Sequence, residues 1–464
     1  MLGEDSRLKA LLARLMRPFT KVHPEEAAMV VLMTGCAFAL LTAYYLLKIV
    51  REPLILSGGG AAVKLYARAG QGLLMVGFVH FYGQLARRVG RVKLLAIVFL
   101  FFLSNLAVFA VLAGTELSTG LAFGLAFFLW VGVFSYTVIA QFWALAADIY
   151  TEEQGKRLFP IIGGGSSIGA MVGALFARWL MQFGVQALMT TALVILLGCL
   201  GVIVWIERRA ATEHVPGPHE DKHPDEPVAR ESAWHLLARD RYLLSIAGLV
   251  VFLNWVNSSG EYLLDRVLTA GASDAAAAAG IDRLRYIGMF KADYSFWYNA
   301  IGVVLQLFAV ARVFKLIGVR NALFVMPIFA FGAYGLASLL PMLAVIRLVK
   351  IGENSLQYSL QDTTRNALFL VTSRVEKFVG KTAVDTIAVR LGAVMTSITV
   401  LIGTSLGWSI ATFLVINAGL ALAWLGFVLL IRGEHRRRST EEPAEIATEP
   451  HSPGPGHHAA AAAR

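Results

Sequence analysis

Polar and charged side chains recur at helical spacing within the otherwise apolar stretch Met342–Leu370. At about 100° per residue they share one stripe that is narrower than roughly a quarter of the helix circumference. The stripe consists of Arg347, Lys350, Asn354, Tyr358, Gln361 and Arg365. Lipid would not tolerate this stripe, so the sequence predicts that it lines a polar passage. Guanidinium and ammonium groups in such a passage would bind phosphate or carboxylate.

Charged side chains also occur in other apolar stretches, where each costs roughly 2.5–3.5 kcal/mol on insertion scales. The predicted substrate-binding residues are Lys48, Arg51, Arg347, Lys350, Asn354, Tyr358 and Arg390. The residues predicted to couple or gate transport are Asp148, Asn257, Glu261, Asp265, Glu353, Asp362, Arg365 and Asp385. Cations outnumber acids among the cavity candidates, which favours an anionic ligand. Fixed ion pairs between helices remain the alternative for any single residue.

Two features suggest how the passage could be controlled. Tyr45-Leu46-Leu47-Lys48 and Tyr262-Leu263-Leu264-Asp265 occupy matching places in two apolar stretches, which predicts that Lys48 and Asp265 form an outer latch. Lys64 and Arg68 lie near the same predicted mouth, where they would attract anions or contact lipid headgroups. Gly165, Gly169 and Gly173 recur every four residues, a spacing that suits close helix packing and also helix sliding.

The composition places these residues in a membrane protein. Hydrophobic residues make up 57% of the 464 residues and charged residues 16%, whereas soluble domains carry about 25% charge. A spanning helix needs about 20 apolar residues, and about twelve stretches qualify. They are Ala27–Val50, Gly60–Gln84, Leu94–Gly114, Gly120–Ile149, Leu158–Gln182, Gln186–Ile206, Tyr242–Leu264, Tyr294–Lys315, Asn321–Leu339, Met342–Leu370, Val379–Ile402 and Leu406–Ile431.

The loops assign an orientation and a domain organisation. Lys and Arg gather in alternate loops, which predicts that both termini are cytoplasmic in a bacterial inner membrane. The predicted order is a cytoplasmic amphipathic segment (1–26), a six-helix bundle (27–206), a cytoplasmic linker (207–241), a second six-helix bundle (242–431) and a disordered cytoplasmic tail (432–464). The role of the outer loop 265–293 stays open. The predicted fold class is therefore an all-α polytopic membrane protein with two six-helix bundles.

Short motifs carry a family resemblance. The stretch Gly83–Arg91 resembles the major facilitator signature Gly-x-x-x-Asp-Arg-x-Gly-Arg, with Arg87 in place of the acid. Three other sets of segments resemble the ATP:ADP antiporter family. They are Tyr45–Glu52, then Ala146–Asp148 with Gly155–Phe159, and last Glu376–Lys381 with Asp385-Thr386 and Arg390–Gly392. This resemblance implies a major facilitator fold whose first, fourth, seventh and tenth helices line a central cavity. It also implies a nucleotide as the substrate.

Enzyme chemistry finds little support in the sequence. Gly380-Lys381-Thr382 lacks the earlier glycine of a P-loop, since Val375 stands in its place. We expect no cofactor and no metal site, because no Cys/His cluster is present. The net charge of +10 is collected in loops, so a nucleic acid polymer is not an expected partner. The expected partners are a small anionic substrate and the lipid bilayer, and a monomer is compatible with the sequence.

The resulting hypothesis is an alternating-access exchanger of an organic anion, with a nucleotide or related phosphorylated metabolite as cargo. One alternative is a proton-coupled transporter of another metabolite, with Glu261 or Asp265 as the proton carrier. The other is a membrane scaffold or sensor that retains a transporter fold without transporting.

Overall fold

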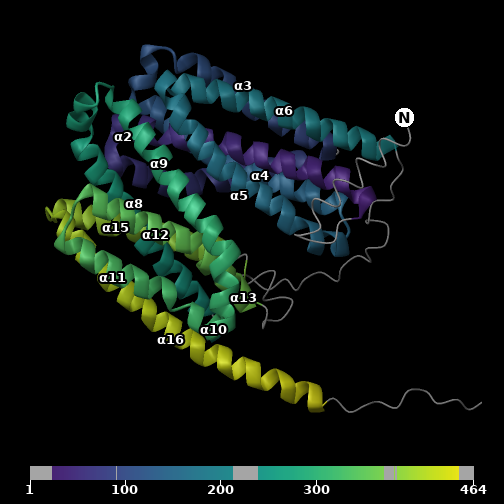
Figure 1. The fold of residues 1–464 in the computed structure, drawn as a ribbon, viewed down its shortest axis with the longest axis vertical. Coiled ribbons are helices and arrows are strands. Elements are labelled where there is room, and N and C mark those ends of the chain that lie inside the picture. Colours follow the sequence, from purple (N-terminus) through teal and green to yellow (C-terminus); the bar gives the residue numbers. More distant parts are fainter. Residues whose placement is uncertain (1–22, 90, 213–238, 370–380, 382–383, 449–464) are drawn as a thin grey trace, which may run out of the picture.

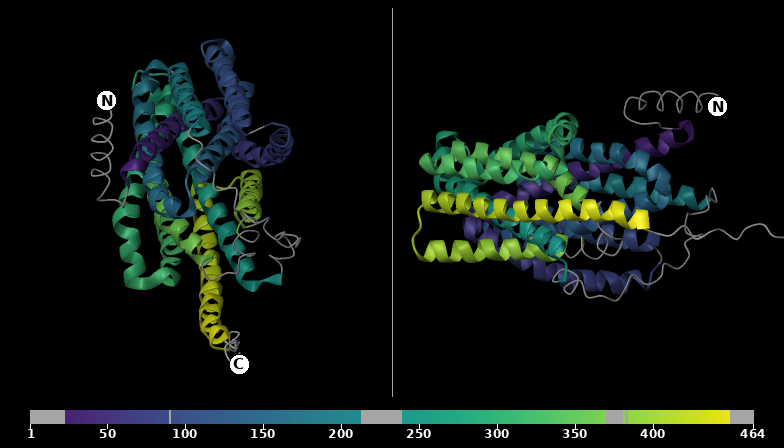
Figure 2. Two further views of the ribbon diagram at one scale, coloured as in Figure 1. Left: turned by 90° about the vertical axis from the view of Figure 1, so that its right-hand side faces the viewer. Right: turned by 90° about the horizontal axis from the view of Figure 1, so that it is seen from below.

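The computed structural model describes residues 23–89, 91–212, 239–369, 381 and 384–448. Every regular element in these residues is a helix. Most of the predicted segment 1–26, most of the linker 207–241 and the last part of the tail lie outside the described residues. The long helices lie side by side along one common direction (Figure 2).

The N-terminal half forms one group of helices (Figure 1). Its elements are α2 (Pro24–Ala86), α3 (Arg91–Leu112), α4 (Leu121–Ile149), α5 (Glu152–Leu180) and α6 (Val185–Thr212). The 63 residues of α2 are far too many for one crossing of about 30 Å. A kink at Gly60, whose φ of 71° favours glycine, divides α2 into the first and second predicted spans.

The C-terminal half forms the second group. It consists of α8 (Arg241–Ala278), α9 (Arg283–Val304), α10 (Val310–Ala322), α11 (Val325–Leu339), α12 (Leu343–Leu356), α13 (Asp362–Leu368), α15 (Val389–Ser405) and α16 (Ile410–Thr448). Three π-helical turns interrupt these helices: η3 (Leu305–Ala309), η4 (Gln357–Gln361) and η7 (Val384–Ala388). Each π-turn adds a residue to a helical turn and so rotates the side chains of the next helical segment about the axis.

The number of spans agrees with the prediction. Within the described residues, nine helices are long and apolar enough to cross a membrane. One of these nine is the divided α2, which contains two spans. The shorter apolar helix α11 and the charged α12–α13 segment supply the two remaining predicted spans.

Three predicted boundaries are wrong. Helix α8 continues to Ala278 instead of ending at Leu264, because the alanine run beyond it has high helix propensity. Helix α9 begins at Arg283 instead of Tyr294, since Asp282 caps it by accepting from the Arg285 N–H. The predicted tail is helical as far as Thr448, because Glu, Arg and Ala continue α16 beyond the apolar stretch.

The small-residue face of α5 packs directly on the first part of α2. A Cβ atom added at Gly165 or Gly173 would lie within 2.9 Å of an α2 backbone oxygen, that of Thr34 or Thr42. At Gly169 the Cβ would overlap the Phe38 backbone, and the Thr42 hydroxyl donates to the Gly169 carbonyl at 3.2 Å. The predicted role in helix packing is therefore confirmed.

Gly169→Ala is expected to destabilise the protein by about 1–3 kcal/mol, because the new methyl group must push two backbones apart. Gly164→Ala is the matched control, since nothing lies within 4 Å of the Cβ position there. The thermal unfolding midpoint of the purified protein should fall for Gly169→Ala and stay unchanged or rise for Gly164→Ala. Equal midpoints for both variants would show that this contact is looser than the structure indicates.

Successive spans run in opposite directions, so their connections alternate between two ends of the molecule. We use the name closed end for the end that carries Gly60, the α5–α6 turn at Gly184 and the α8–α9 turn at Gly280. The opposite end, where α6 stops and α8 begins, is called the linker end. The two halves meet mainly through α2 and α5 on one side and α8 and α9 on the other.

Candidate functional site

An apolar cluster joins the two halves at the closed end. Ile55, Leu56 and Ala67 of α2 and Phe128 of α4 pack against Leu268 and Ala272 of α8 and Ile287 of α9. The exposed fraction of each of these side chains is 8% or less. We call this cluster the seal, because side chains of both halves close over one another there.

Next to the seal lies a buried network of acids and lysines, here called the closed-end network. It contains Glu52 and Lys64 of α2, Glu261 and Asp265 of α8, and Lys291 of α9. The Asp265 carboxylate lies 2.6 Å from the Lys64 Nζ and 2.5 Å from the Lys291 Nζ. Lys64 also pairs with Glu52, so one lysine binds an acid from each half. These bonds bridge the halves.

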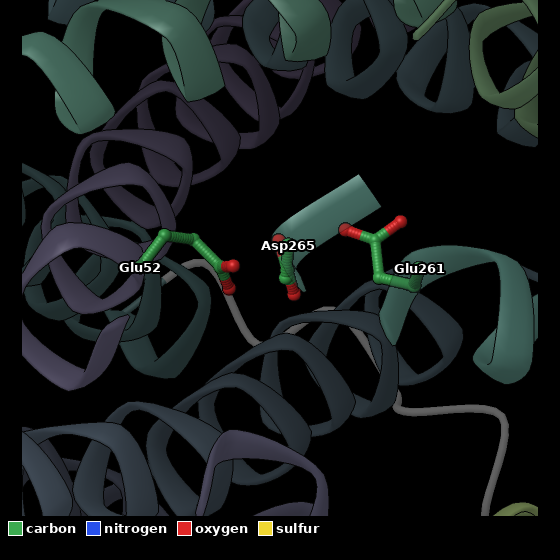
Figure 3. A group of neighbouring side chains, drawn as sticks. All are labelled: Glu52, Glu261 and Asp265. Atoms are coloured by element: carbon green, nitrogen blue, oxygen red, sulfur yellow. The ribbon is translucent and has the colours of Figure 1, made fainter. Parts of the chain in front are cut away.

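The three acids of this network point towards one another (Figure 3). One carboxylate oxygen from each of Glu52, Glu261 and Asp265 lies within 4.8 Å of the others, a spacing that could hold a metal ion. Lys64 and Lys291 already neutralise the same three carboxylates. The two ammonium groups therefore take the place that a cation would have in this cluster.

A second bridge between the halves lies beside α5. The Asp293 carboxylate of α9 pairs with Arg178 of α5 and lies 3.7 Å from the Arg347 guanidinium of α12. Arg347 also stacks over the Phe290 ring at 4.9 Å. The structure thus places the predicted binding residue Arg347 in a shared ion pair.

Lys350 is fully buried in the C-terminal half, with 0% of the side chain exposed. Its Nζ lies 2.6 Å from the Glu353 carboxylate and donates to the Asn257 carbonyl at 3.1 Å. The Tyr334 hydroxyl donates to the same Glu353 oxygen at 2.5 Å. In this conformation the charge of Lys350 is matched within its own helix, and a substrate has no direct access to it.

A chain of hydrogen bonds connects the Lys350 pair to the closed-end network. Asn257, whose carbonyl binds Lys350, donates through Nδ2 to Asn354 at 2.9 Å. Asn354 donates to the Tyr294 hydroxyl at 2.6 Å, and Tyr294 donates to Glu261 at 3.0 Å. The sequence predicts Asn257 and Asn354 as site residues from their places on helix faces. In the structure, hydrogen bonds of these two residues link the Lys350–Glu353 pair to the closed-end network.

Lys48 differs from the other interior cations. Its Nζ donates to the Tyr298 hydroxyl at 3.0 Å and lies 4.7 Å from the centre of the Tyr45 ring. Among the described residues, no acid lies within 4.0 Å of this half-buried ammonium. The two tyrosines come from different halves, since Tyr45 belongs to α2 and Tyr298 to α9. Tyr45 also donates to Asn299 of α9 at 3.0 Å. The predicted latch between Lys48 and Asp265 is wrong, since Asp265 binds Lys64 and Lys291 instead.

The single predicted stripe on α12 is broken by the π-turn η4. Tyr358, within the turn, is 51% exposed, and its ring lies 5.7 Å from the Tyr298 ring. Gln361 closes the turn and is 1% exposed, and neither its amide nitrogen nor its amide oxygen has a hydrogen-bond partner among the residues that the structure describes. The extra residue turns Tyr358 and Gln361 away from the positions that a regular helix gives them.

The remaining predicted residues are not among the printed partners of Lys48. The Arg365 guanidinium lies 3.6 Å from Asp362 and 3.8 Å from Asp385, near the linker end of the C-terminal half. The exposed Arg390 of α15 fills the space beside Gly72 of α2, where the two halves touch. Asp148 lies in the last turn of α4. None of these placements tests the predicted roles, which stay predictions.

Several interior residues are absent from the predicted site residues. Glu52 stands beside Arg51, whose guanidinium it binds at 3.3 Å, and Lys64, predicted at the outer mouth, is only 6% exposed. Lys291 falls within the predicted outer loop. A cap signal at Asp282, together with the apolar pattern from Leu284 onward, could have extended the helix and revealed Lys291.

The sequence comparisons find carriers. No protein-family profile matches the chain. It is 23% identical over 295 residues to an ADP,ATP carrier protein 1 of Chlamydia pneumoniae, covering 54% of this chain and 55% of the carrier. It is 22% identical over 295 residues to the protein of the same name from Chlamydia trachomatis serovar D, covering 54% and 53%. The chain thus matches about half the length of these curated relatives.

Solved structures share the fold over nearly the whole chain. A POT family transporter, PepTSo, superposes with a TM-score of 0.61 at 12% identity, covering 88% of this chain and 98% of that one. The nucleoside transporter NupG gives 0.59 at 11% identity, covering 86% and 98%. A bacterial homologue of the lysosomal transporter Spinster gives 0.55 at 12% identity, covering 90% and 98%. The chain is therefore an all-α polytopic membrane protein with a major facilitator-type fold that resembles the ADP,ATP carriers.

Proposed function

We propose that the protein is a secondary active transporter that exchanges organic anions, with a nucleotide or related phosphorylated metabolite as cargo. The observation that carries the proposal is Lys48, a half-buried ammonium between the halves without an acid partner in the described residues. An interior charge is costly unless something neutralises it. A bound anion would do so, and the resemblance to ADP,ATP carriers supports a nucleotide.

The proposed cycle is alternating access. With both termini cytoplasmic, as the loop charges predict, the closed end faces outward from the inner membrane. The seal and the closed-end network then hold the protein in an inward-facing state. Transport would require Lys64 and Lys291 to release their acids from the other half, so that the closed end opens while the linker end closes.

The two alternatives explain less of this arrangement. A proton carrier at Glu261 or Asp265 would use the closed-end network but would leave Lys48 without an acid partner in the described residues. A scaffold without cargo would have no need to keep Lys48 charged and unpaired between the halves. Exchange uses both Lys48 and the closed-end network. The anionic cargo pairs with Lys48, and the ion pairs of the closed-end network form when the closed end shuts and break when it opens.

A ligand screen by thermal unfolding tests the proposal. At about 100 times the dissociation constant, a cargo stabilises the folded state by roughly 2.7 kcal/mol, which raises the unfolding midpoint. We expect nucleotides or sugar phosphates to raise the midpoint of the wild type and of Lys93→Gln, an exposed control, but to raise that of Lys48→Gln much less. If no nucleotide, sugar phosphate or carboxylate stabilises the folded wild-type protein, the proposal is wrong and the scaffold is favoured.

A further inference from the structure

The π-turn η4 interrupts the predicted polar stripe where α12 meets α13. Resting on the proposed alternating access, we infer that η4 is a two-state element that changes with the closed end. While the closed end is shut, the turn is π-helical and buries the Gln361 amide. When the closed end opens, the turn becomes regular α-helix, and the amide rotates to the polar face of α12, where it finds hydrogen-bond partners.

The buried Gln361 amide makes the π-helical state costly. Gln361 is 1% exposed, and its Nε2 and Oε1 have no hydrogen-bond partner in the part of the chain that the structure describes. Such a group gives up its bonds to water and gains none in return. Removing the extra residue from the turn would rotate Gln361 by roughly 100°, towards the face that carries Lys350 and Asn354. The shut state is therefore held by contacts elsewhere and against the preference of this turn.

Hydroxyl groups along η4 make the change of helix type easy. A π-turn alters which carbonyl groups receive a backbone N–H, and serine and threonine hydroxyls can bind the carbonyls that lose one. The Ser359 hydroxyl donates to the Ser355 carbonyl at 2.6 Å, and the Thr363 hydroxyl donates to the Ser359 carbonyl at 2.7 Å. The Thr364 hydroxyl donates to the Leu360 carbonyl at 2.6 Å. These carbonyls keep a donor in either helix type.

The beginning of η4 is connected to the closed-end network. The Gln357 Oε1 accepts from the Asn257 Nδ2 at 2.7 Å, and the same nitrogen donates to Asn354 at 2.9 Å. Asn354 continues through the Tyr294 hydroxyl to Glu261 of the network. Loss of the ion pairs across the halves would free Glu261 to move, and this chain of hydrogen bonds would carry the movement to the first residue of η4.

The middle of η4 is connected to the other half. The Tyr358 ring lies 5.7 Å from the Tyr298 ring, and the Tyr298 hydroxyl accepts from Lys48 of α2 at 3.0 Å. Because Lys48 belongs to the N-terminal half and Tyr298 to the C-terminal half, opening the closed end separates them. Both connections of η4 thus change in the movement that opens the closed end.

Two substitutions at Gln361 test the inference in the purified protein in detergent. The reporter is a cysteine at Ala272 of the seal, with Cys36 and Cys199 replaced by alanine, and its reaction rate with a maleimide measures opening. Gln361→Met removes the unpartnered amide at similar size, so the unfolding midpoint should rise and labelling should slow about tenfold. Gln361→Glu places a carboxylate in the buried position, so labelling should become at least about tenfold faster.

Gln357→Met is the matched control, because it removes the same kind of side chain from the other end of the same turn. Its amide oxygen is hydrogen-bonded, so the unfolding midpoint should fall where that of Gln361→Met rises.

Two results would overturn the inference. A lower unfolding midpoint for Gln361→Met would mean that the amide has a partner and that the π-helical state carries no cost. A higher midpoint with wild-type labelling rates for both Gln361 variants would mean that Gln361 affects only local packing. These measurements use no cargo. If the variants behave as expected but no anion binds the folded protein, the proposed function fails while the two-state turn stands.

Discussion

Lys350→Met is expected to lower the free energy of unfolding by about 3–5 kcal/mol, a loss typical of a buried ion pair that keeps only one partner. Removing the ammonium leaves the Glu353 carboxylate in a place where 1% of that residue is exposed. Of the described residues, the Tyr334 hydroxyl alone, 2.5 Å from the carboxylate, would still bind it. The sequence alone predicts instead that Lys350 binds the anion directly.

A double variant separates these two explanations. Lys350→Met together with Glu353→Gln removes both charges, so most of the lost stability should return. Thermal unfolding of the two single variants and the double variant in detergent measures the coupling. If Lys350→Met alone leaves the unfolding midpoint unchanged but abolishes anion binding, the role in substrate binding is right and the structural role is wrong.

Asp265→Ala is expected to open the closed end. Asp265 holds Lys64 at 2.6 Å and Lys291 at 2.5 Å. Arg51 also binds Glu52 of this network, so the loss of Asp265 leaves three cations with two carboxylates between the halves. Loss of one partner of a buried pair costs about 3–5 kcal/mol, and only about 1.4 kcal/mol of bias changes a population tenfold. A cysteine placed at Ala272 in the seal, which is 0% exposed, should react at least about tenfold faster with an impermeant maleimide.

In every variant the native cysteines Cys36 and Cys199, both buried, are replaced by alanine so that the maleimide reacts with the reporter cysteine at position 272 alone. Glu116→Ala removes an exposed acid at the same end and should leave the labelling rate unchanged. Lys64→Ala combined with Asp265→Ala restores the charge balance and should label more slowly than Asp265→Ala alone. Equal labelling of Asp265→Ala and the wild type would mean that the network does not hold the closed end shut.

The fold was predictable because its signals are long and redundant. Runs of about 20 apolar residues are needed to cross a bilayer, and few other structures require them. The repeats at Tyr45 and Tyr262 lie on the matching helices α2 and α8, and both tyrosines are buried. Helix ends were less predictable, because alanine runs and caps such as Asp282 extend helices after the apolar pattern stops.

The partners of the interior charges were not predictable. The sequence repeat pairs Asp265 with Lys48, but its partners come from the second part of α2 and from α9, and only the packing of those helices brings them together. The π-turn η4 is similar, because one inserted residue changes which side chains face the interior while the sequence keeps its helical period. Tyr358 and Gln361 therefore lie in different surroundings from those that a regular helix predicts.

Exchange in proteoliposomes tests the central claim most directly, because it requires the anion site, both access states and the passage between them. Vesicles with the purified protein are loaded with unlabelled nucleotide or left empty, and uptake of labelled nucleotide is measured over time. Loaded vesicles should take up label faster than empty ones, and Lys48→Gln should remove the difference. Equal uptake by loaded and empty vesicles, or no uptake of any anion by the folded protein, would contradict the account.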